Sequence, residues 1–212
     1  MIVAQISVSV DGYAAGPSPS LEDPLGIGGM QLHEWAVRLE AWRRQHGLDG
    51  GEVDVDTPLV EEAGNAGAVV MGRRMFSGGD GPWDDDPNST GWWGDEPPFH
   101  APVFVVTHHA RPPLELTGTT FTFVTDGVAA ALAQARDAAG EGDVQVSGGA
   151  DVIRQAIALG RGDELQLHTA PVVRGGGTAL LDGVAPEALE IVETIGTPQA
   201  THVRYRITKT HS

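Results

Sequence analysis

The stretch that decides the fold is Asp143-Val144-Gln145-Val146-Ser147-Gly148-Gly149-Ala150-Asp151. Residues 143–147 predict a short strand, and residues 151–159 predict a helix that ends at a glycine. A strand that turns into a helix through two glycines presents bare backbone N–H groups and the positive end of the helix dipole. The stretch therefore predicts a turn that can bind a pyrophosphate, with a turn needed only for packing as the alternative. It lacks the G-x-G-x-x-G spacing and does not follow the first strand, so it does not indicate a Rossmann fold.

Strands and helices alternate on both sides of this stretch. Period-two or compact apolar runs predict strands at 2–10, 68–71, 103–107 and 119–124, and helical spacing predicts helices at 31–46, 57–66 and 126–139. The C-terminal part does not alternate in this way. It contains three segments with strand patterns and no helix between them, at 164–169, 189–194 and 203–208. The pattern predicts an α/β protein of three layers, α/β/α, with a mostly parallel central sheet and antiparallel strands at its C-terminal edge.

Length and composition restrict the protein classes. The 212 residues suit one domain over 1–212, with two small domains as a weaker interpretation. A segment rich in Gly, Asp, Pro and Trp at about 77–100 predicts an ordered insertion loop, whose carboxylates Asp84, Asp85 and Asp86 we expect to be solvated. A formal net charge of −16 argues against nucleic-acid and membrane-surface partners. The absence of cysteine excludes disulfides and thiolate chemistry. Without a signal peptide or an apolar span, we expect a cytoplasmic protein.

Two arginines follow the buried strand that residues 68–71 predict. Arg73 and Arg74 come directly after Gly72, at the edge of the sheet where open α/β folds bind their ligands. A guanidinium group matches phosphate oxygens with paired hydrogen bonds. The pair therefore favours a phosphate-bearing cofactor, with a surface ion pair to a carboxylate as the alternative.

Histidines at two other places allow further interpretations. His108 and His109 follow the strand at 103–107, but adjacent residues of an extended chain point to opposite faces, so we expect no metal site. Metal-dependent hydrolysis through this pair stays a minor alternative. His33, Glu34 and Trp35 begin the first helix, where a titratable group and a ring could meet a substrate, or where they form only a solvated helix start.

The order of these motifs resembles the dihydrofolate reductase-like superfamily. The branch it resembles is the C-terminal reductase domain of the bifunctional riboflavin-biosynthesis deaminase-reductase, and the resemblance covers nearly the whole chain. The motifs are, in order, Ser9-Val10-Asp11-Gly12, Val69-Val70-Met71-Gly72-Arg73-Arg74, Val105-Val106-Thr107, Val146-Ser147-Gly148-Gly149, and Asp163-Glu164-Leu165-Gln166-Leu167-His168 with Pro171 and Gly175-Gly176-Gly177.

The resemblance implies NADPH as hydride donor and a homodimer. It implies that Gly72, Arg73 and Arg74 hold the 2′-phosphate region, with Thr107 and His108 beside them. It assigns the pyrophosphate to Ser147, Gly148, Gly149, Ala150, Asp151 and Val152. The nicotinamide and substrate side would be lined by residues around Ser7, Asp11, Ala14 and Ala15.

The candidate catalytic residues are Glu34, the nearest carboxylate to the one that folate reducers carry on the first helix, and Asp11. Candidate substrate-binding residues are Ser7, His33, Trp35 and Trp83, and Trp83 belongs to a Trp-rich insertion with Trp92 and Trp93 that could cover a flat substrate. Because the setting of Glu34 differs from that of folate reducers, we expect another substrate than dihydrofolate. The resulting hypothesis is an NADPH-dependent reductase of a small planar heterocycle, pterin-like or riboflavin-precursor-like. The alternative is a non-catalytic nucleotide-binding or ligand-sequestering protein of the same fold.

Overall fold

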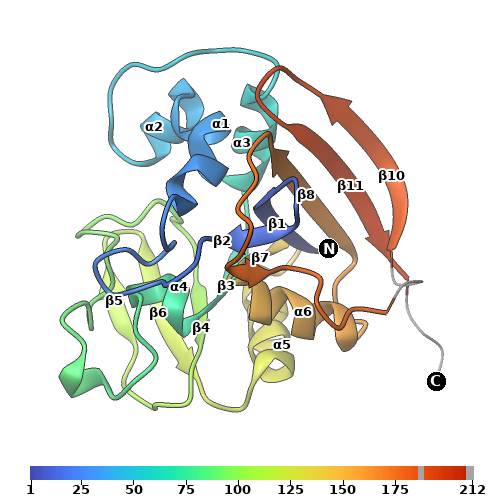
Figure 1. Cartoon of the computed structure of the whole chain (residues 1–212). Coiled ribbons are helices and arrows are strands. Elements are labelled where there is room, and N and C mark those ends of the chain that lie inside the picture. The colour runs from blue at the N-terminus through green and yellow to red at the C-terminus, as the bar shows by residue number, and fades with distance from the viewer. Residues whose placement is uncertain (186–188, 209–212) are drawn as a thin grey trace.

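A computed structural model describes residues 1–185 and 189–208 of the chain. A nine-stranded sheet forms its centre, with helices on both faces (Figure 1). The strands, in their order across the sheet, are β10 (Leu189–Gly196), β11 (Thr201–Ile207), β8 (Glu164–Ala170), β1 (Ile2–Ser9), β7 (Val144–Gly148), β3 (Ala68–Gly72), β4 (Val103–Val106), β6 (Thr119–Val124) and β5 (Leu114–Leu116). A separate small sheet pairs β2 (Tyr13–Ala15) with β9 (Thr178–Ala179).

The middle of the large sheet is parallel. From β8 through β1, β7, β3 and β4 to β6, each strand pairs in parallel with the next. The antiparallel edge expected from the tail is present in β11 and β10, whereas β8 pairs in parallel with β1 because α6 carries the chain back across the sheet before β8 begins. The carboxyl ends of six neighbouring strands therefore meet at one edge of the sheet.

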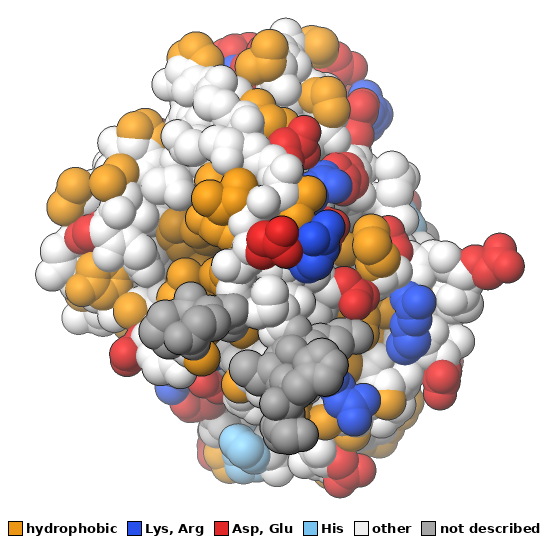
Figure 2. Space-filling model, turned by 90° about the vertical axis from the view of Figure 1, so that its right-hand side faces the viewer, with side chains coloured by type: hydrophobic (Ala, Val, Ile, Leu, Met, Phe, Trp, Pro, Cys, Tyr) orange, Lys and Arg blue, Asp and Glu red, His pale blue; other side chains and the backbone are white. Residues whose placement is uncertain are grey.

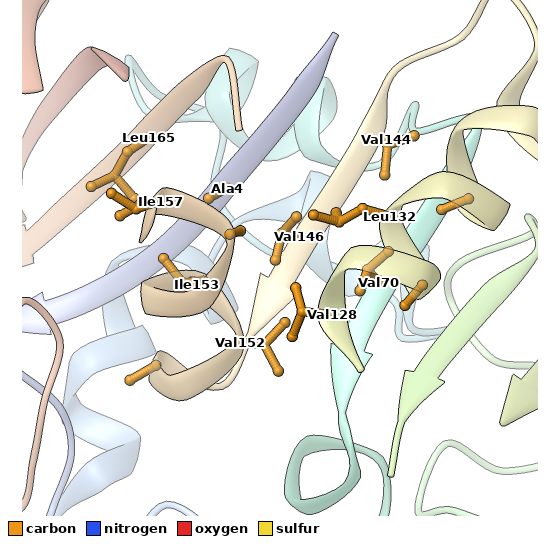
Figure 3. Packing of buried hydrophobic residues seen from close by; sticks show 14 of the residues in the cluster. Ala4, Val70, Val128, Leu132, Val144, Val146, Val152, Ile153, Ile157 and Leu165 are labelled. Atoms are coloured by element: carbon orange, nitrogen blue, oxygen red, sulfur yellow. The ribbon is translucent and has the colours of Figure 1, made fainter. Parts of the chain in front are cut away.

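Helices α5 (Val128–Ala139) and α6 (Ala150–Ala158) cover one face of the sheet (Figure 1). Their apolar side chains pack on the strand residues that point to this face, and Figure 3 shows Leu132 and Ile153 against the sheet. Because side chains alternate along a strand, Val70 points into this cluster while its neighbours Val69 and Met71 point to the opposite face.

The opposite face is covered in two parts. Short helices lie over the β8 and β1 side and enclose a cluster around Trp35, Leu39 and Val60. Over β3, β4 and β6, the segment 77–100 packs its aromatic side chains Trp83 and Trp93 against the strands. The short helical elements are η1 (Gly29–His33), α1 (Glu34–Val37), α2 (Glu40–Gln45), α3 (Thr57–Ala63), α4 (Arg73–Ser77) and η2 (Trp83–Asp85).

The expected single helix at 31–46 is wrong. The chain forms η1, α1 and α2 instead, and Leu39 between α1 and α2 is extended, with φ −77° and ψ 142°. The backbone N–H of Glu40 donates to Glu52 O at 2.8 Å, and the N–H of Glu52 donates to Arg38 O at 3.0 Å. This pairing replaces helical hydrogen bonds and turns Leu39 fully into the core, where it is 0 % exposed.

The face that carries β10 shows basic and acidic side chains next to one another, with apolar side chains between them (Figure 2). Arg206 of β11 and Glu190 of β10, for example, form an ion pair of 3.1 Å. None of the described helices is long and apolar enough to cross a membrane.

Replacing Leu132 by alanine tests the packing of α5 on the sheet. Leu132 is 1 % exposed, so Leu132→Ala removes buried methyl groups and leaves a cavity. We expect a loss of about 2–5 kcal/mol in the free energy of unfolding, measured by urea denaturation. Leu159→Ala is the control, because Leu159 is 48 % exposed and its truncation should change stability by no more than about 0.5 kcal/mol. Equal losses in both variants would contradict this core.

Candidate functional site

A cleft of about 1220 Å³ opens along the carboxyl ends of the central strands. It extends over the face of the sheet opposite α5 and α6, and side chains from β1, β3, β4 and β7 all reach it. Most residues predicted from the sequence to form the site line this cleft. They are Ser7, Ala14, Ala15, His33, Trp35, Gly72, Arg73, Arg74, Thr107, His108, Ser147, Gly149, Ala150, Asp151 and Val152.

The turn between β7 and α6 forms one wall. Gly148 has φ +123°, a conformation that suits only glycine, and the Gly148–Gly149 peptide bond is cis. A Cβ added to Gly149 would have no heavy atom within 4 Å, so open space lies beside its backbone. Gly149 also precedes the first turn of α6, whose residues Ala150, Asp151 and Val152 line the same cleft. The turn thus combines an approachable backbone with the positive end of a nine-residue helix.

The end of β3 packs directly against this turn. A Cβ added to Gly72 would lie 3.1 Å from Val152 Cγ2 and 3.6 Å from Gly149 N, so a side chain at position 72 would press on the turn. Helix α4 begins at the next residue and carries the two arginines. The structure therefore brings the two phosphate-suited motifs of the sequence together.

Arg73 turns away from solvent into a buried ion pair. Its guanidinium group bonds to the Asp86 carboxylate and to Ser77 Oγ, and it stacks 3.6 Å from the centre of the Trp83 ring. Arg73 and Asp86 are 6 % and 8 % exposed, so the expectation of a solvated Asp86 is wrong. Burial alone would raise the pKa of Asp86, but hydrogen bonds from Ser77 and Arg73 outweigh it and lower the pKa below its usual value. Arg73 anchors the insertion loop to the site.

Arg74 is an exposed cation at the cleft. Its side chain is 71 % exposed and pairs with Asp80, which also lines the cleft. The hydrogen bond from Arg74 lowers the pKa of Asp80, which keeps this carboxylate charged. An incoming phosphate could replace Asp80 as the partner of Arg74, because exposed ion pairs of this kind are weak.

Thr107 and His108 line the cleft just after the end of β4. Thr107 is buried, and its hydroxyl accepts a hydrogen bond of 3.1 Å from the backbone N–H of His109. His108 is exposed and lines the cleft. Within residues 1–185 and 189–208, no group of three His, Asp or Glu side chains is arranged to hold a metal ion. Among these residues, His108 and His109 have no third side chain beside them to complete a metal-binding group.

Aromatic side chains line the other half of the cleft. Trp35 is buried, and its Nε1–H donates to Ser7 Oγ at 2.9 Å. From the insertion loop, Trp92 and Trp93 line the cleft. His33 reaches it as well, and burial lowers the pKa of its imidazole, which favours the neutral ring. Flat, mostly apolar surfaces of this kind are suited to a planar ligand.

Four predicted residues do not line the cleft. Glu34 is exposed, so it cannot act as the buried proton donor that the sequence suggested. The Asp11 carboxylate accepts hydrogen bonds from the backbone N–H groups of Arg174 and Gly175. A hydrogen bond from Ser9, together with the bonds from Arg174 and Gly175, lowers the pKa of this carboxylate to about 2. Asp11 thus fixes a loop and does not reach the substrate side. Trp83 holds Arg73 and donates to His109 O at 2.7 Å. Gly148 is covered within the turn.

The polar residues of the cleft that sequence reasoning missed include Gln5, Gln145 and His168. A signal for two of them was present: Gln5 lies on the polar side of the first strand with Ser7, and Gln145 on the same side of β7 as Ser147. The parallel pairing of Val3 with Gln145 places these polar positions on one face of neighbouring strands. Only the pairing of β8 with β1, which sets Ser7 beside His168, shows that His168 joins them.

The sheet order, the covering helices and the cleft at the strand ends together define a dihydrofolate reductase-like α/β fold with a ligand site suited to phosphate. The sequence matches the RibD C-terminal domain family over residues 1–203, so the chain belongs to this family. A comparison with curated proteins gives no match.

Solved structures with low sequence identity share this fold. A protein assigned to riboflavin biosynthesis from Shewanella sp. PV-4 is 18% identical with a TM-score of 0.64, and the alignment covers 98% of this chain and 99% of that one. The diaminohydroxyphosphoribosylaminopyrimidine deaminase/5-amino-6-(5-phosphoribosylamino)uracil reductase from Thermotoga maritima is 14% identical, with a TM-score of 0.55. The alignment covers 98% of this chain and 56% of that one. Dihydrofolate reductase from Enterococcus faecalis, complexed with NADP(H) and RAB-propyl, is 14% identical, with a TM-score of 0.54. The alignment covers 99% of this chain and 97% of that one.

The two arginines should differ sharply in their effect on stability. Arg73→Ala leaves the buried carboxylate of Asp86 without its cation, so we expect a loss of about 3–5 kcal/mol in the free energy of unfolding. Arg74→Ala removes an exposed ion pair and should cost less than about 1 kcal/mol. Urea denaturation of both variants measures the difference. A small, equal loss would show that Arg73 does not anchor the insertion loop.

Proposed function

We propose that this protein is an NADPH-dependent reductase of a small planar heterocycle, pterin-like or riboflavin-precursor-like. The observation that carries the proposal is the contact between the ends of β3 and β7, which sets Arg74 and the start of α6 along one cleft. Membership in the RibD C-terminal domain family supports a reductase-type oxidoreductase. The shared fold with a dihydrofolate reductase complexed with NADP(H) supports the choice of cofactor.

The cleft fits the phosphates of the cofactor. Open space beside Gly149 allows a pyrophosphate to approach the backbone, and the N–H groups at the start of α6 can donate to it. The carboxylate of Asp151, which would oppose an anion, accepts from Arg154 at 3.2 Å and from Gln155 at 2.9 Å. Arg74 supplies a guanidinium for the 2′-phosphate region, whereas Arg73 acts by holding the loop in place. When bound, NADPH supplies the hydride.

The protein's own residues orient the substrate and exclude water. Trp35 is fixed by its hydrogen bond to Ser7, so its ring presents a rigid wall. Trp92 and Trp93 face the cleft from the insertion loop and can cover a flat ring. In such a site the protein positions the nicotinamide against the substrate and tunes the electrostatics, while the cofactor carries the chemistry.

The exposure of Glu34 favours a second candidate, a nucleotide-binding protein that sequesters its ligand without turnover. The decisive experiment is a screen for NADPH oxidation, followed by absorbance, with pterins, ribitylaminopyrimidine precursors and simple quinones. Turnover with any of them supports the reductase. NADPH binding without turnover across the screen supports sequestration, and no NADPH binding overturns both.

The remaining expectations from the sequence are proposals as well. We propose that the protein works as a homodimer in the cytoplasm, with a small-molecule substrate and without nucleic-acid or membrane partners. The net charge of −16 supports the exclusion of polyanions. The exposed edge strand β10, with Ile191 64 % exposed, leaves a surface on which a second copy could pack.

Adding one methyl group at Gly149 tests the pyrophosphate site. The Cβ of Gly149→Ala meets no protein atom, so the free energy of unfolding should change by no more than about 0.5 kcal/mol. The methyl group occupies the space beside the backbone that the phosphate needs, so the NADPH Kd should rise about tenfold or more, measured by titration calorimetry. Gly176→Ala is the matched control, because Gly176 also has open space around it and lies outside the cleft. Unchanged affinity in Gly149→Ala would place the phosphates elsewhere.

Arg74 and Asp80 should shift NADPH affinity in opposite directions. Arg74→Ala removes a charge-assisted contact worth ~1.5–3 kcal/mol, so the NADPH Kd should rise about tenfold or more. Asp80→Asn removes the carboxylate that competes for Arg74 and should lower the Kd. Titration with NADH, which lacks the 2′-phosphate, gives the comparison. If Arg74→Ala weakens NADPH and NADH equally, Arg74 does not contact the 2′-phosphate.

A further inference from the structure

A chain of buried polar contacts runs from Asp56 to the floor of the cleft. Asp56 Oδ1 lies 3.3 Å from His202 Nε2, and His202 Nδ1 lies 2.8 Å from His168 Nδ1. His168 Nε2 lies 2.9 Å from Gln5 Nε2, and Gln5 Oε1 accepts from Gln145 Nε2 at 3.0 Å. Asp56, His202 and His168 are 0 %, 4 % and 3 % exposed. The chain therefore connects the inside of the protein with residues that line the cleft.

The charge of Asp56, at the buried end of this chain, sets which group donates and which accepts in the contacts that follow. Asp56 pairs with Arg38 at 3.2 Å, and a carboxylate can only accept. The charge of the Asp56 carboxylate, 3.3 Å away, favours the His202 tautomer with its proton on Nε2, although the two atoms do not meet hydrogen-bond geometry. In that tautomer His202 accepts at Nδ1, so His168 carries its proton on Nδ1 and accepts at Nε2. The acceptor at His168 turns the NH₂ group of Gln5 toward it, and the carbonyl of Gln5 then faces Gln145.

Both histidines are suited to this role because they are neutral. Burial lowers the pKa of His168 to about 3, with the neighbouring His202 and His33 as further causes. Burial also lowers the pKa of His202, although Asp56 acts in the opposite direction. Trp35 packs on both rings, with centroids 4.6 Å and 4.9 Å away. A neutral imidazole has one donor and one acceptor, so the position of the proton on one ring determines its position on the next.

The cleft end of the chain offers a defined pair of groups. Gln145 uses its NH₂ group on Gln5, and its carbonyl oxygen has no partner among the residues that the structure describes. Ser7 accepts from Trp35, so its hydroxyl proton is free to donate, again with no acceptor within the described part of the chain. Both residues line the cleft. An acceptor and a donor thus lie on one face of neighbouring strands.

We propose that Gln145 is a specificity-determining residue, oriented through Gln5, His168 and His202, and that it selects a heterocycle whose edge carries an amino or ring N–H donor. The inference deepens the proposed function, on which it rests for the kind of ligand, by naming the edge that the substrate presents. His168 and His202 are positioning residues, since they act on the substrate through Gln145.

The proton positions can be read in the unmodified protein without any ligand. Long-range ¹H–¹⁵N correlation spectra at pH 7, with His202→Gln used for assignment, report which nitrogen of each imidazole is protonated. We expect His168 to be protonated only on Nδ1 and His202 only on Nε2. The opposite tautomers, or an imidazolium at either position, would overturn the inference. This result does not depend on NADPH, so it is separate from the test of the proposed function.

Probe molecules test the selection itself. 2-Aminopyrimidine and 2-methylpyrimidine have nearly the same shape, and only the amino compound donates to Gln145. In the wild type we expect the amino compound to bind about 3- to 10-fold more tightly, measured by ligand-observed NMR titration. Gln145→Leu should abolish this preference. A preference that persists in Gln145→Leu, or is absent from the wild type, would overturn the role of Gln145.

Two substitutions of His202 test whether this residue orients Gln145 from outside the cleft, because His202 does not line the cleft. His202→Phe removes the acceptor for His168, which frees Gln5 and Gln145 to turn, so the preference for 2-aminopyrimidine should fall. His202→Gln keeps one acceptor and one donor and should retain the preference. If both variants keep it, His202 does not position Gln145. If the wild type fails to bind NADPH, the proposed function fails while these outcomes still decide the present inference.

Discussion

The close approach of β3 and β7 at their carboxyl ends is the constraint on which the site depends. Gly72 packs closely on this region: a Cβ at position 72 would lie 3.1 Å from Val152 Cγ2, so the Val152 side chain would have to shift, and 3.6 Å from Gly149 N. The contact sets the start of α6 beside the start of α4, and Gly149, Ala150 and Arg74 line one cleft. Glycine at both strand ends allows close packing and leaves the backbone accessible, so the packing interpretation and the proposed phosphate site are compatible for this turn.

The same contact explains why two adjacent arginines have different roles. α4 begins directly after Gly72, and successive residues of a helix point in different directions. One guanidinium therefore turns inward, where Asp86, Ser77 and the Trp83 ring enclose it, and the next turns to solvent. The buried pair ties the insertion loop to the strand end, and the loop in turn brings Trp92 and Trp93 to the cleft. The shape of the substrate side thus depends on a side chain that is held in a buried ion pair.

The sequence predicted what local patterns determine. Period-two runs and the Gly-Gly turn identified the central strands and the wall of the cleft, because these depend on neighbouring residues. The extended Leu39 could not be predicted, since its backbone pairs with Glu52, and no helical pattern records that contact. Asp86 looked like a solvated acid among others, and only the fold brings Arg73 to it. Likewise Asp56, His168 and His202 lie far apart in the chain, and their contacts arise from the order of the strands.

The proposed binding of a phosphate-rich anion is compatible with a net charge of −16, because three acids near the phosphate-suited wall of the cleft are engaged locally. Asp86 is neutralised by Arg73, Asp80 by Arg74, and Asp151 by Arg154. Acids on β10 act over longer distances, and salt screens such interactions beyond about 8 Å at physiological ionic strength. When a phosphate takes the place of Asp80 beside Arg74, one ion pair is exchanged for another. The gain then comes from the backbone amides of α6, which are fixed in direction, so the cleft favours an anion of defined shape over anions in general.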